Sequence, residues 1–252
     1  MIERIVHDKI LELRLSRPPV NAISPELTKL LLAAVREAPA QGFRALVISG
    51  TPGMYSAGLD VPTLLTLDRA GISAFWKDFF ALMSAVARSP IPTVAAITGH
   101  SPAGGAVISI FCDYRVMATG KYRIGLNEVQ VGLMVPEVIQ LAYKRLLGAH
   151  RAERLMVAGT MLESDVAHTI GLVDELAEVD QVIPRAIAWC QATLALPSEA
   201  MSGTRRMARR DLADIMSDAS RFPADEFADA WFGEETQSTL RALVAKLKSK
   251  SG

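Results

Sequence analysis

The segment of residues 91–113 constrains the fold more than any other part of the chain. Residues 91–98 form an apolar, β-branched run that predicts a buried strand. Small residues at 103–106 lead from it into a second apolar run, the pattern of a strand, a tight turn and a buried helix. Gly104 and Gly105 allow a ligand or another backbone to approach this turn closely.

A helix that begins at this turn would direct free N–H groups and the positive end of its dipole toward a ligand. Such a helix start suits an oxygen atom that carries negative charge. The alternative is that the two glycines only allow the helix and the strand to pack closely, because short glycine motifs also occur without a function.

The composition is that of an ordinary globular protein, with 50% hydrophobic and 21% charged residues. Lysine plus arginine and aspartate plus glutamate number 27 each, so the charge gives no reason to expect nucleic acid or an anionic membrane. The sequence shows no targeting segment and no apolar run near the roughly 18 residues that span a bilayer. We therefore expect a cytoplasmic protein, or a mitochondrial matrix protein if a transit peptide has been removed.

The cysteine and histidine residues do not suggest a metal site. Cys112 and Cys190 are the only cysteines and form no CxxC motif, and the four histidines are scattered without metal-ligand spacing. We expect neither a disulfide framework nor a bound metal.

Strand and helix patterns alternate along the first part of the chain, which predicts an α/β fold. Among them, Ser24-Pro25-Glu26 predicts a helix start, residues 44–49 predict a short apolar strand, and the apolar spacing over 74–88 predicts a second helix. Three helical patterns follow, at about residues 180–195, 198–218 and 225–249. We expect a core domain over residues 1–195 and a helical C-terminal section over 196–252. Within that section, a cluster of four arginines is expected to form a solvated helix face, with a phosphate contact as the alternative: Arg205, Arg206, Arg209 and Arg210.

Two glycine-containing turns could act together. The segments 56–60 and 103–105 each follow a predicted strand, and together they could supply two backbone N–H donors to one oxygen, forming an oxyanion hole. Glu128 lies between Leu126 and Val129, and an apolar setting would raise the pKa of its carboxyl toward the range of a general acid/base. Composition alone would make Glu128 a surface carboxylate.

The motifs and their spacing resemble those of the crotonase (enoyl-CoA hydratase/isomerase) superfamily. The likeness rests on Ser56-Ala57-Gly58-Leu59-Asp60, Pro102-Ala103-Gly104-Gly105, Cys112-Asp113-Tyr114-Arg115 and Ile124-Gly125-Leu126-Asn127-Glu128, and it extends from Arg17 to the last helix. Within the superfamily, the sequence is most similar to the mitochondrial-type 3,2-trans-enoyl-CoA isomerases. The resemblance implies a crotonase (ClpP-like) fold of repeated ββα units, with the C-terminal helices used for trimerisation.

The resemblance also implies roles for particular residues. It assigns the oxyanion donors to the backbone N–H groups of Leu59 and Gly104, and the catalytic acid/base to Glu128. The substrate-binding residues that it implies are Ser56, Ala57, Gly58, Asp60 and Asn127, with Asp60 expected to stabilise its turn. Trp231 and Phe232 would contact coenzyme A or a neighbouring subunit, or only pack in the core.

Val107 occupies the position where the family's hydratases carry their first catalytic glutamate. Because hydration normally needs water held between two carboxylates, this replacement favours an isomerase that moves a double bond with one base. Val107, Val129 and Leu133 are expected to form an apolar wall that excludes water. Glu137 is the other carboxylate that could serve as a second acid.

The expected activity is the conversion of a 3-enoyl-CoA to a 2-trans-enoyl-CoA in fatty acid β-oxidation, with no cofactor beyond the coenzyme A of the substrate. The expected assembly is a homotrimer or a hexamer. The alternatives are an enoyl-CoA hydratase, another acyl-CoA enzyme such as a thioester hydrolase, and an inactive CoA-binding paralogue.

Overall fold

The computed structural model describes residues 1–251, excepting the side chains of residues 248, 250 and 251. Its largest sheet has six strands, in which β1 and β2 pair antiparallel and the remaining neighbours pair parallel. In spatial order the strands are β1 (Ile2–His7), β2 (Ile10–Leu15), β3 (Ala45–Ser49), β5 (Thr93–Ile97), β7 (Tyr114–Ala118) and β10 (Glu175–Ala177). In the register Val47 lies opposite Val94, and Ala96 lies opposite Val116.

A smaller sheet continues from the ends of three of these strands. It contains β4 (Gly53–Met54), β6 (Gly99–Pro102), β8 (Arg123–Gly125) and β9 (Leu162–Glu163). β4, β6 and β8 follow β3, β5 and β7 along the chain, and each pair of strands is followed by a helix. The repeated ββα units expected from the family resemblance are therefore present.

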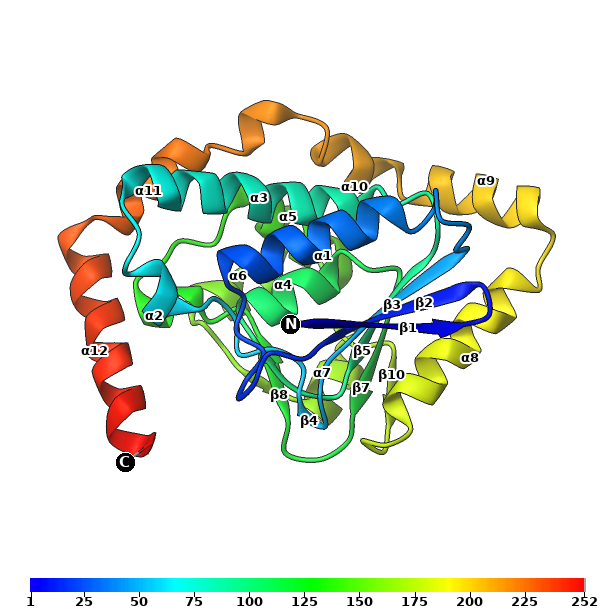
Figure 1. Ribbon diagram of the computed structural model, residues 1–252, viewed down its shortest axis with the longest axis horizontal. Helices are drawn as coiled ribbons and strands as arrows, with labels where there is room; N and C mark the ends of the chain where they lie inside the picture. The colour runs from blue at the N-terminus through cyan, green and yellow to red at the C-terminus, as the bar shows by residue number, and fades with distance from the viewer. Residues whose placement is uncertain (252) are drawn as a thin grey trace.

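Helices cover both faces of the six-stranded sheet (Figure 1). The helices up to residue 195 are α1 (Pro25–Glu37), α2 (Val61–Leu64), α3 (Arg69–Ala87), α4 (Gly104–Ile110), α5 (Glu137–Leu147), α6 (Ala149–Val157), α7 (Ser164–Thr169) and α8 (Val182–Leu194). The one-turn 3-10 helix η1 (Glu128–Val131) precedes α5.

The central strands are apolar on both faces because alternate residues enter two cores. Leu46 and Ile48 of β3 belong to the main core, with residues of α1, α3 and α4. Ala45 and Val47 of the same strand belong to a smaller core, formed with α8. This double burial explains why 44–49 and 91–98 appear in the sequence as continuous apolar runs.

Side-chain caps set the starts of two long helices. The Ser24 hydroxyl accepts a hydrogen bond from the Leu27 amide at 3.2 Å, so α1 begins at Pro25 as the sequence predicts. The Asp68 carboxylate accepts one from the Gly71 amide at 2.8 Å, and α3 begins at Arg69, earlier than its apolar pattern indicates.

The C-terminal section contains shorter helices than the sequence predicts. These are α9 (Ser198–Ala208), α10 (Arg210–Ile215), the 3-10 helix η2 (Ala219–Arg221), α11 (Ala224–Trp231) and α12 (Glu234–Ser251). α11 packs along α3, where the rings of Trp76 and Phe227 lie 5.3 Å apart. α12 extends away from the sheets at one side of the molecule (Figure 1).

The prediction of a solvated arginine face is wrong for Arg205 and Arg209. Arg205 donates two hydrogen bonds of 2.8 Å to the Asp113 carboxylate, and Arg209 forms an ion pair with the same group at 3.2 Å. Burial alone would raise the pKa of Asp113, but the hydrogen bonds and charges of the two arginines hold it below its usual value. The network fixes α9 to the segment that follows α4. None of the described helices is long and apolar enough to cross a membrane.

Candidate active site

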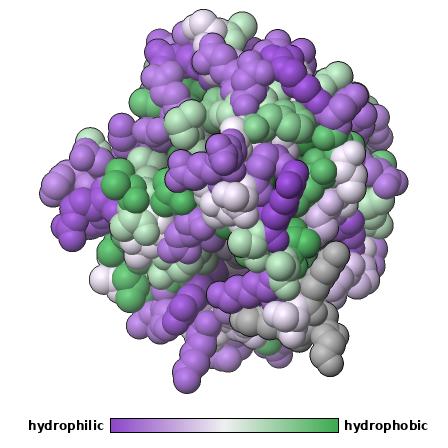
Figure 2. All heavy atoms as spheres, turned by 90° about the vertical axis from the view of Figure 1, so that its left-hand side faces the viewer, coloured by the Kyte–Doolittle hydropathy of each residue, from purple (hydrophilic) through white to green (hydrophobic). Residues whose placement is uncertain are grey.

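A cavity of about 450 Å³ lies where the turns after β4 and β6 meet η1. It brings together residues far apart in the sequence: Ala57, Leu59, Asp60, Gly104, Val107, Asn127 and Glu128. Side chains from α2 and α12 complete its wall. Figure 2 shows the face that carries these two helices, on which hydrophobic and hydrophilic residues are interspersed.

The two glycine turns touch each other beside the cavity. Gly58 has a φ of +86°, and a Cβ added there would lie 3.1 Å from the Ala103 Cβ and 3.2 Å from the Pro102 carbonyl oxygen. A Cβ on Gly104 would lie 2.9 Å from the Ile23 side chain and 3.5 Å from the Gly58 Cα. A larger residue at position 58 would therefore push the two turns apart, whereas one at position 104 would mainly displace the Ile23 side chain.

The hydrogen bonds around these turns leave two amides without a protein acceptor. The Ile23 amide donates to the Gly58 carbonyl at 2.8 Å, and the Ile23 carbonyl accepts from the Asp60 amide at 3.0 Å. Neither of these two bonds uses the Leu59 N–H, which lies between them. Within residues 1–251, no acceptor is recorded for the amide of Leu59 or for that of Gly104. Both residues line the cavity, so these donors are available for an oxygen of a ligand.

The backbone at the second turn is strained. Ala103, directly before α4, has a φ of +45°, and residues other than glycine rarely adopt a positive φ. Its amide donates to the Gly125 carbonyl at 2.9 Å, and its carbonyl accepts from the Val107 amide at 2.9 Å. These bonds hold the turn in a conformation that costs free energy, a feature that clusters at functional sites.

Glu128 is a buried carboxylate at the start of η1. Glu128 is 8% exposed, and its buried Oε2 atom has no hydrogen-bond partner in the part of the chain that the structure describes. Burial raises the pKa of this carboxyl to about 7, against a smaller opposing effect of its own backbone N–H. A carboxyl with that pKa can both accept and return a proton near neutral pH.

The other residues expected at the site occupy different positions. Asn127 lines the cavity, and its buried Oδ1 has no partner among the described residues. Asp60 caps α2 through the Thr63 amide and binds Arg17 at 2.5 Å. Ser56 is not among the lining residues. Its hydroxyl accepts from the Gly58 amide at 3.2 Å and donates to the Asn21 carbonyl at 2.8 Å, so it shapes the turn.

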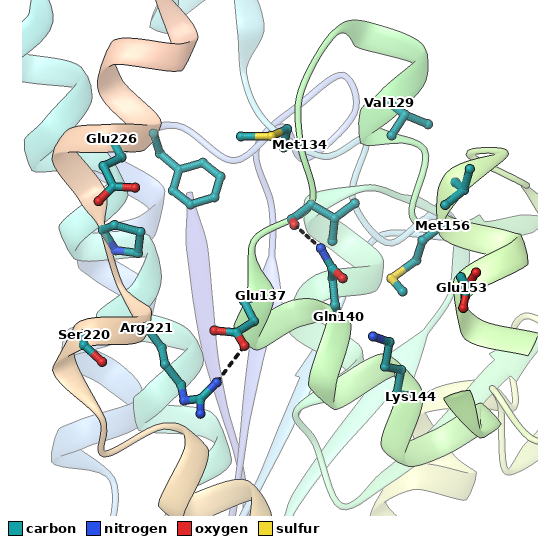
Figure 3. Close-up of a pocket in the computed structure, with 14 residues that line it drawn as sticks. Val129, Met134, Glu137, Gln140, Lys144, Glu153, Met156, Ser220, Arg221 and Glu226 are labelled. Carbon is teal, nitrogen blue, oxygen red and sulfur yellow. Dashed lines mark hydrogen bonds and ion pairs between the residues drawn. The ribbon is translucent and has the colours of Figure 1, made fainter. Parts of the chain in front are cut away.

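Two expectations about the wall and the second acid are not met. Val129 does not line this cavity but a separate pocket of about 480 Å³, where its side chain is 42% exposed (Figure 3). The reason is that successive residues of the tight 3-10 turn point in different directions. Glu137 lines the same separate pocket, where Arg221 donates to its Oε1 at 2.7 Å.

The sequence did not single out the apolar lining from other helices. Trp76 and Phe79 of α3, Ile139 of α5 and Leu243 of α12 all face the cavity. Their helical spacing is typical of any core face, so it carries no signal of a ligand site. Trp231 is fully buried and Phe232 is 43% exposed, and neither lines the cavity.

Comparison with known protein families and sequences points to one family. The family described as enoyl-CoA hydratase/isomerase matches residues 6–250. The chain is 33% identical over 243 residues to the mitochondrial enoyl-CoA delta isomerase 1 of Mus musculus, covering 95% of this chain and 84% of that protein. It is also 31% identical over 194 residues to a probable enoyl-CoA hydratase of Mycobacterium avium, covering 77% and 75% of the two chains.

The fold has a similar counterpart among solved structures. The crystal structure of human mitochondrial delta3-delta2-enoyl-CoA isomerase superposes with a TM-score of 0.93, at 27% sequence identity, and the match covers 100% of this chain and 99% of that one. The crotonase fold expected from the sequence is thereby confirmed.

Proposed function

We propose, from the premise that the chain belongs to the enoyl-CoA hydratase/isomerase family, that it converts a 3-enoyl-CoA to a 2-trans-enoyl-CoA. One observation carries the choice of isomerisation over hydration. Of the two carboxylates that line the cavity, Asp60 is bound to Arg17 and Thr63, while Glu128 has a free oxygen and Val107 stands where a second catalytic glutamate would be. The substrate would come from the β-oxidation of unsaturated fatty acids.

The two free amides supply the electrostatic part of the proposed mechanism. The thioester carbonyl oxygen accepts hydrogen bonds from the N–H groups of Leu59 and Gly104. Removal of a proton from C2 sends negative charge to this oxygen and produces a dienolate, which the two donors stabilise. Loss of one such donor typically costs about 10²–10³ in rate.

Glu128 carries out both proton transfers in this proposal. As a carboxylate it takes the proton from C2, and as a carboxylic acid it returns that proton to C4, so the double bond moves from C3–C4 to C2–C3. No atom is gained or lost, and the carboxylate is regenerated. The pKa of about 7 supports this dual role, because the acid and base forms are then both accessible near neutral pH.

The apolar lining supports a reaction that does not consume water. Val107, Leu133 and Ile139 line the cavity around the proposed reaction centre. An apolar wall holds the acyl chain and keeps water from quenching the dienolate. Hydration or thioester hydrolysis would need a water molecule held by a second polar group in the place of Val107.

The test offers the protein a 3-enoyl-CoA and, separately, a 2-enoyl-CoA. Double-bond movement is followed by the ultraviolet absorbance of the conjugated thioester, and water addition by mass spectrometry. We expect rapid conversion of the first substrate and little hydration of the second. Efficient hydration would identify a hydratase, and binding without turnover of either compound would identify an inactive CoA-binding paralogue.

A further inference from the structure

Two buried polar groups without partners lie on adjoining elements of the site. Tyr143 of α5 is fully buried, and its hydroxyl has no hydrogen-bond partner among the described residues. The Oε2 atom of Glu128 is likewise buried without a hydrogen-bond partner among these residues. Buried polar groups are nearly always paired, so the unpaired groups at this cavity, which include Asn127 Oδ1 and Trp76 Nε1 as well, require an explanation.

The geometry of α5 directs Tyr143 toward the region of Glu128. Pro136 and Ile139 line the cavity together with Glu128, and Tyr143 lies one helical turn beyond Ile139 on the same face. The Gln140 amide donates to the Val135 carbonyl at 2.9 Å, which ties the segment after η1 to this helix. Tyr143 therefore lies one turn beyond the lining residue Ile139, on the helix that is tied to the segment after η1.

The electrostatic coupling of the two groups agrees with this placement. Burial first, and the negative charge of Glu128 second, raise the pKa of the Tyr143 hydroxyl above its ordinary value. The other charged groups of α5 and of the cavity wall have partners or lie elsewhere. On the cavity wall, Arg17 and Asp60 bind each other. On α5, Glu137 binds Arg221, Arg145 binds Asp211, and Lys144 lines the separate pocket.

We propose that Tyr143 is a positioning residue whose hydroxyl is linked to the Glu128 carboxylate by hydrogen bonds through one water molecule, and so fixes the orientation of the base. The inference rests on the proposed function, in which Glu128 is the proton shuttle. A donor to the ionised form stabilises it and offsets part of the cost of burial. The phenol stays protonated throughout, so it does not compete as a base.

The test compares Tyr143→Phe with wild type by a measurement that needs no substrate. The titration of Glu128 is followed by carbon NMR of protein labelled at the glutamate carboxyl carbons, with Glu128→Gln identifying the resonance. We expect Tyr143→Phe to raise the pKa of Glu128 by at least half a pH unit, because the ionised form loses a donor. The acidic limb of the kcat/KM profile should move to higher pH by the same amount, with KM little changed.

Tyr55→Phe is the matched control. Tyr55 is also fully buried, and its hydroxyl likewise has no partner within the described residues, but the charge coupled to it is that of Cys112 rather than Glu128. This variant removes the same atoms and should leave the Glu128 titration unchanged. Incorporation of 3,5-difluorotyrosine at position 143 gives a stronger donor and should lower the pKa of Glu128.

The outcomes separate the two proposals. An unchanged or lower Glu128 pKa in Tyr143→Phe, or an equal rise in Tyr55→Phe, overturns the role of Tyr143. A raised pKa in a protein that does not isomerise 3-enoyl-CoA upholds the coupling of the two groups and overturns the proposed function instead.

Discussion

A carboxyl oxygen buried without a hydrogen-bond partner is costly, and among the described residues Oε2 of Glu128 has none on the wall of a largely apolar cavity. Val107 lines the same cavity and offers no second acid. Together these residues support the proposed isomerisation, because hydration normally needs water held between two carboxylates, whereas one base is enough to move a proton between two carbon atoms.

The change Glu128→Gln keeps the shape of the side chain and removes its ability to shuttle a proton. We expect the rate of isomerisation to fall by about 10²–10⁴, with the affinity for the acyl-CoA nearly unchanged, since the loss falls on the transition state. Steady-state kinetics and a direct binding measurement check both parts. Glu137→Gln is the matched control and should behave as wild type, because Glu137 lines the separate pocket. A normal rate in Glu128→Gln would rule out Glu128 as the base.

The same residue predicts a pH-dependent stability difference. A carboxyl whose pKa rises from 4.5 when unfolded to about 7 when folded binds its proton more tightly in the native state. Its contribution to stability is therefore fully present below pH 4.5 and is lost as the pH rises through 7. A rise of this size corresponds to roughly 3 kcal/mol.

Glu128→Gln should remove the loss of stability that wild type shows as the pH rises, because glutamine does not titrate. Relative to wild type, its free energy of unfolding should increase between pH 5 and pH 8, by up to roughly 3 kcal/mol. Denaturant titrations at the two pH values, at one protein concentration, provide the measurement. A difference between the two proteins that does not vary with pH would show that Glu128 titrates normally in the folded chain.

At the scale of elements, the site depends on the close approach of the turn after β4 to the turn after β6. Gly58→Ala would place a Cβ 3.1 Å from the Ala103 Cβ, at a φ of +86°. We expect the strained backbone to cost about 1 kcal/mol of stability, and the displaced turn to move the Leu59 amide. The rate should then fall toward the ~10²-fold loss typical of one missing oxyanion donor.

Gly42→Ala separates strain from displacement. Gly42 has a φ of +87°, and a Cβ added there meets nothing within 4 Å. The two variants should lose similar stability in denaturant titrations, while only Gly58→Ala loses isomerase rate. Equal rates in the two variants would contradict the requirement for contact between the turns.

The sequence predicts these elements well where the determinants are local. The cap at Ser24, the apolar runs of β3 and β5 and the glycines of the two turns each depend on neighbouring residues, and the structure has them as expected. The pocket that Val129 enters could not be predicted, because it depends on the orientation of a single 3-10 turn.

At the scale of the whole molecule, contacts between residues far apart in the sequence determine which side chains are buried, paired or part of the cavity wall. Arg205 and Arg209 have the spacing of an exposed helix face, yet their partner Asp113 lies more than 90 residues earlier in the chain. The apolar face of α3 likewise gave no sign that Trp76 and Phe79 line a ligand cavity. Such residues acquire their roles only when distant elements pack together.

The last prediction concerns assembly through the helical C-terminal section. Met207 of α9 is 65% exposed and Leu196 before it is 53% exposed, and both lie in the C-terminal section that we expect to form the contact between subunits. We expect sedimentation equilibrium at micromolar concentration to give three or six times the chain mass of 27.2 kDa. Met207→Lys should weaken this assembly, whereas Val6→Lys, at a 61% exposed position of β1, should not. A monomeric mass for wild type would contradict the trimer, and an intact assembly in Met207→Lys would exclude α9 from the contact.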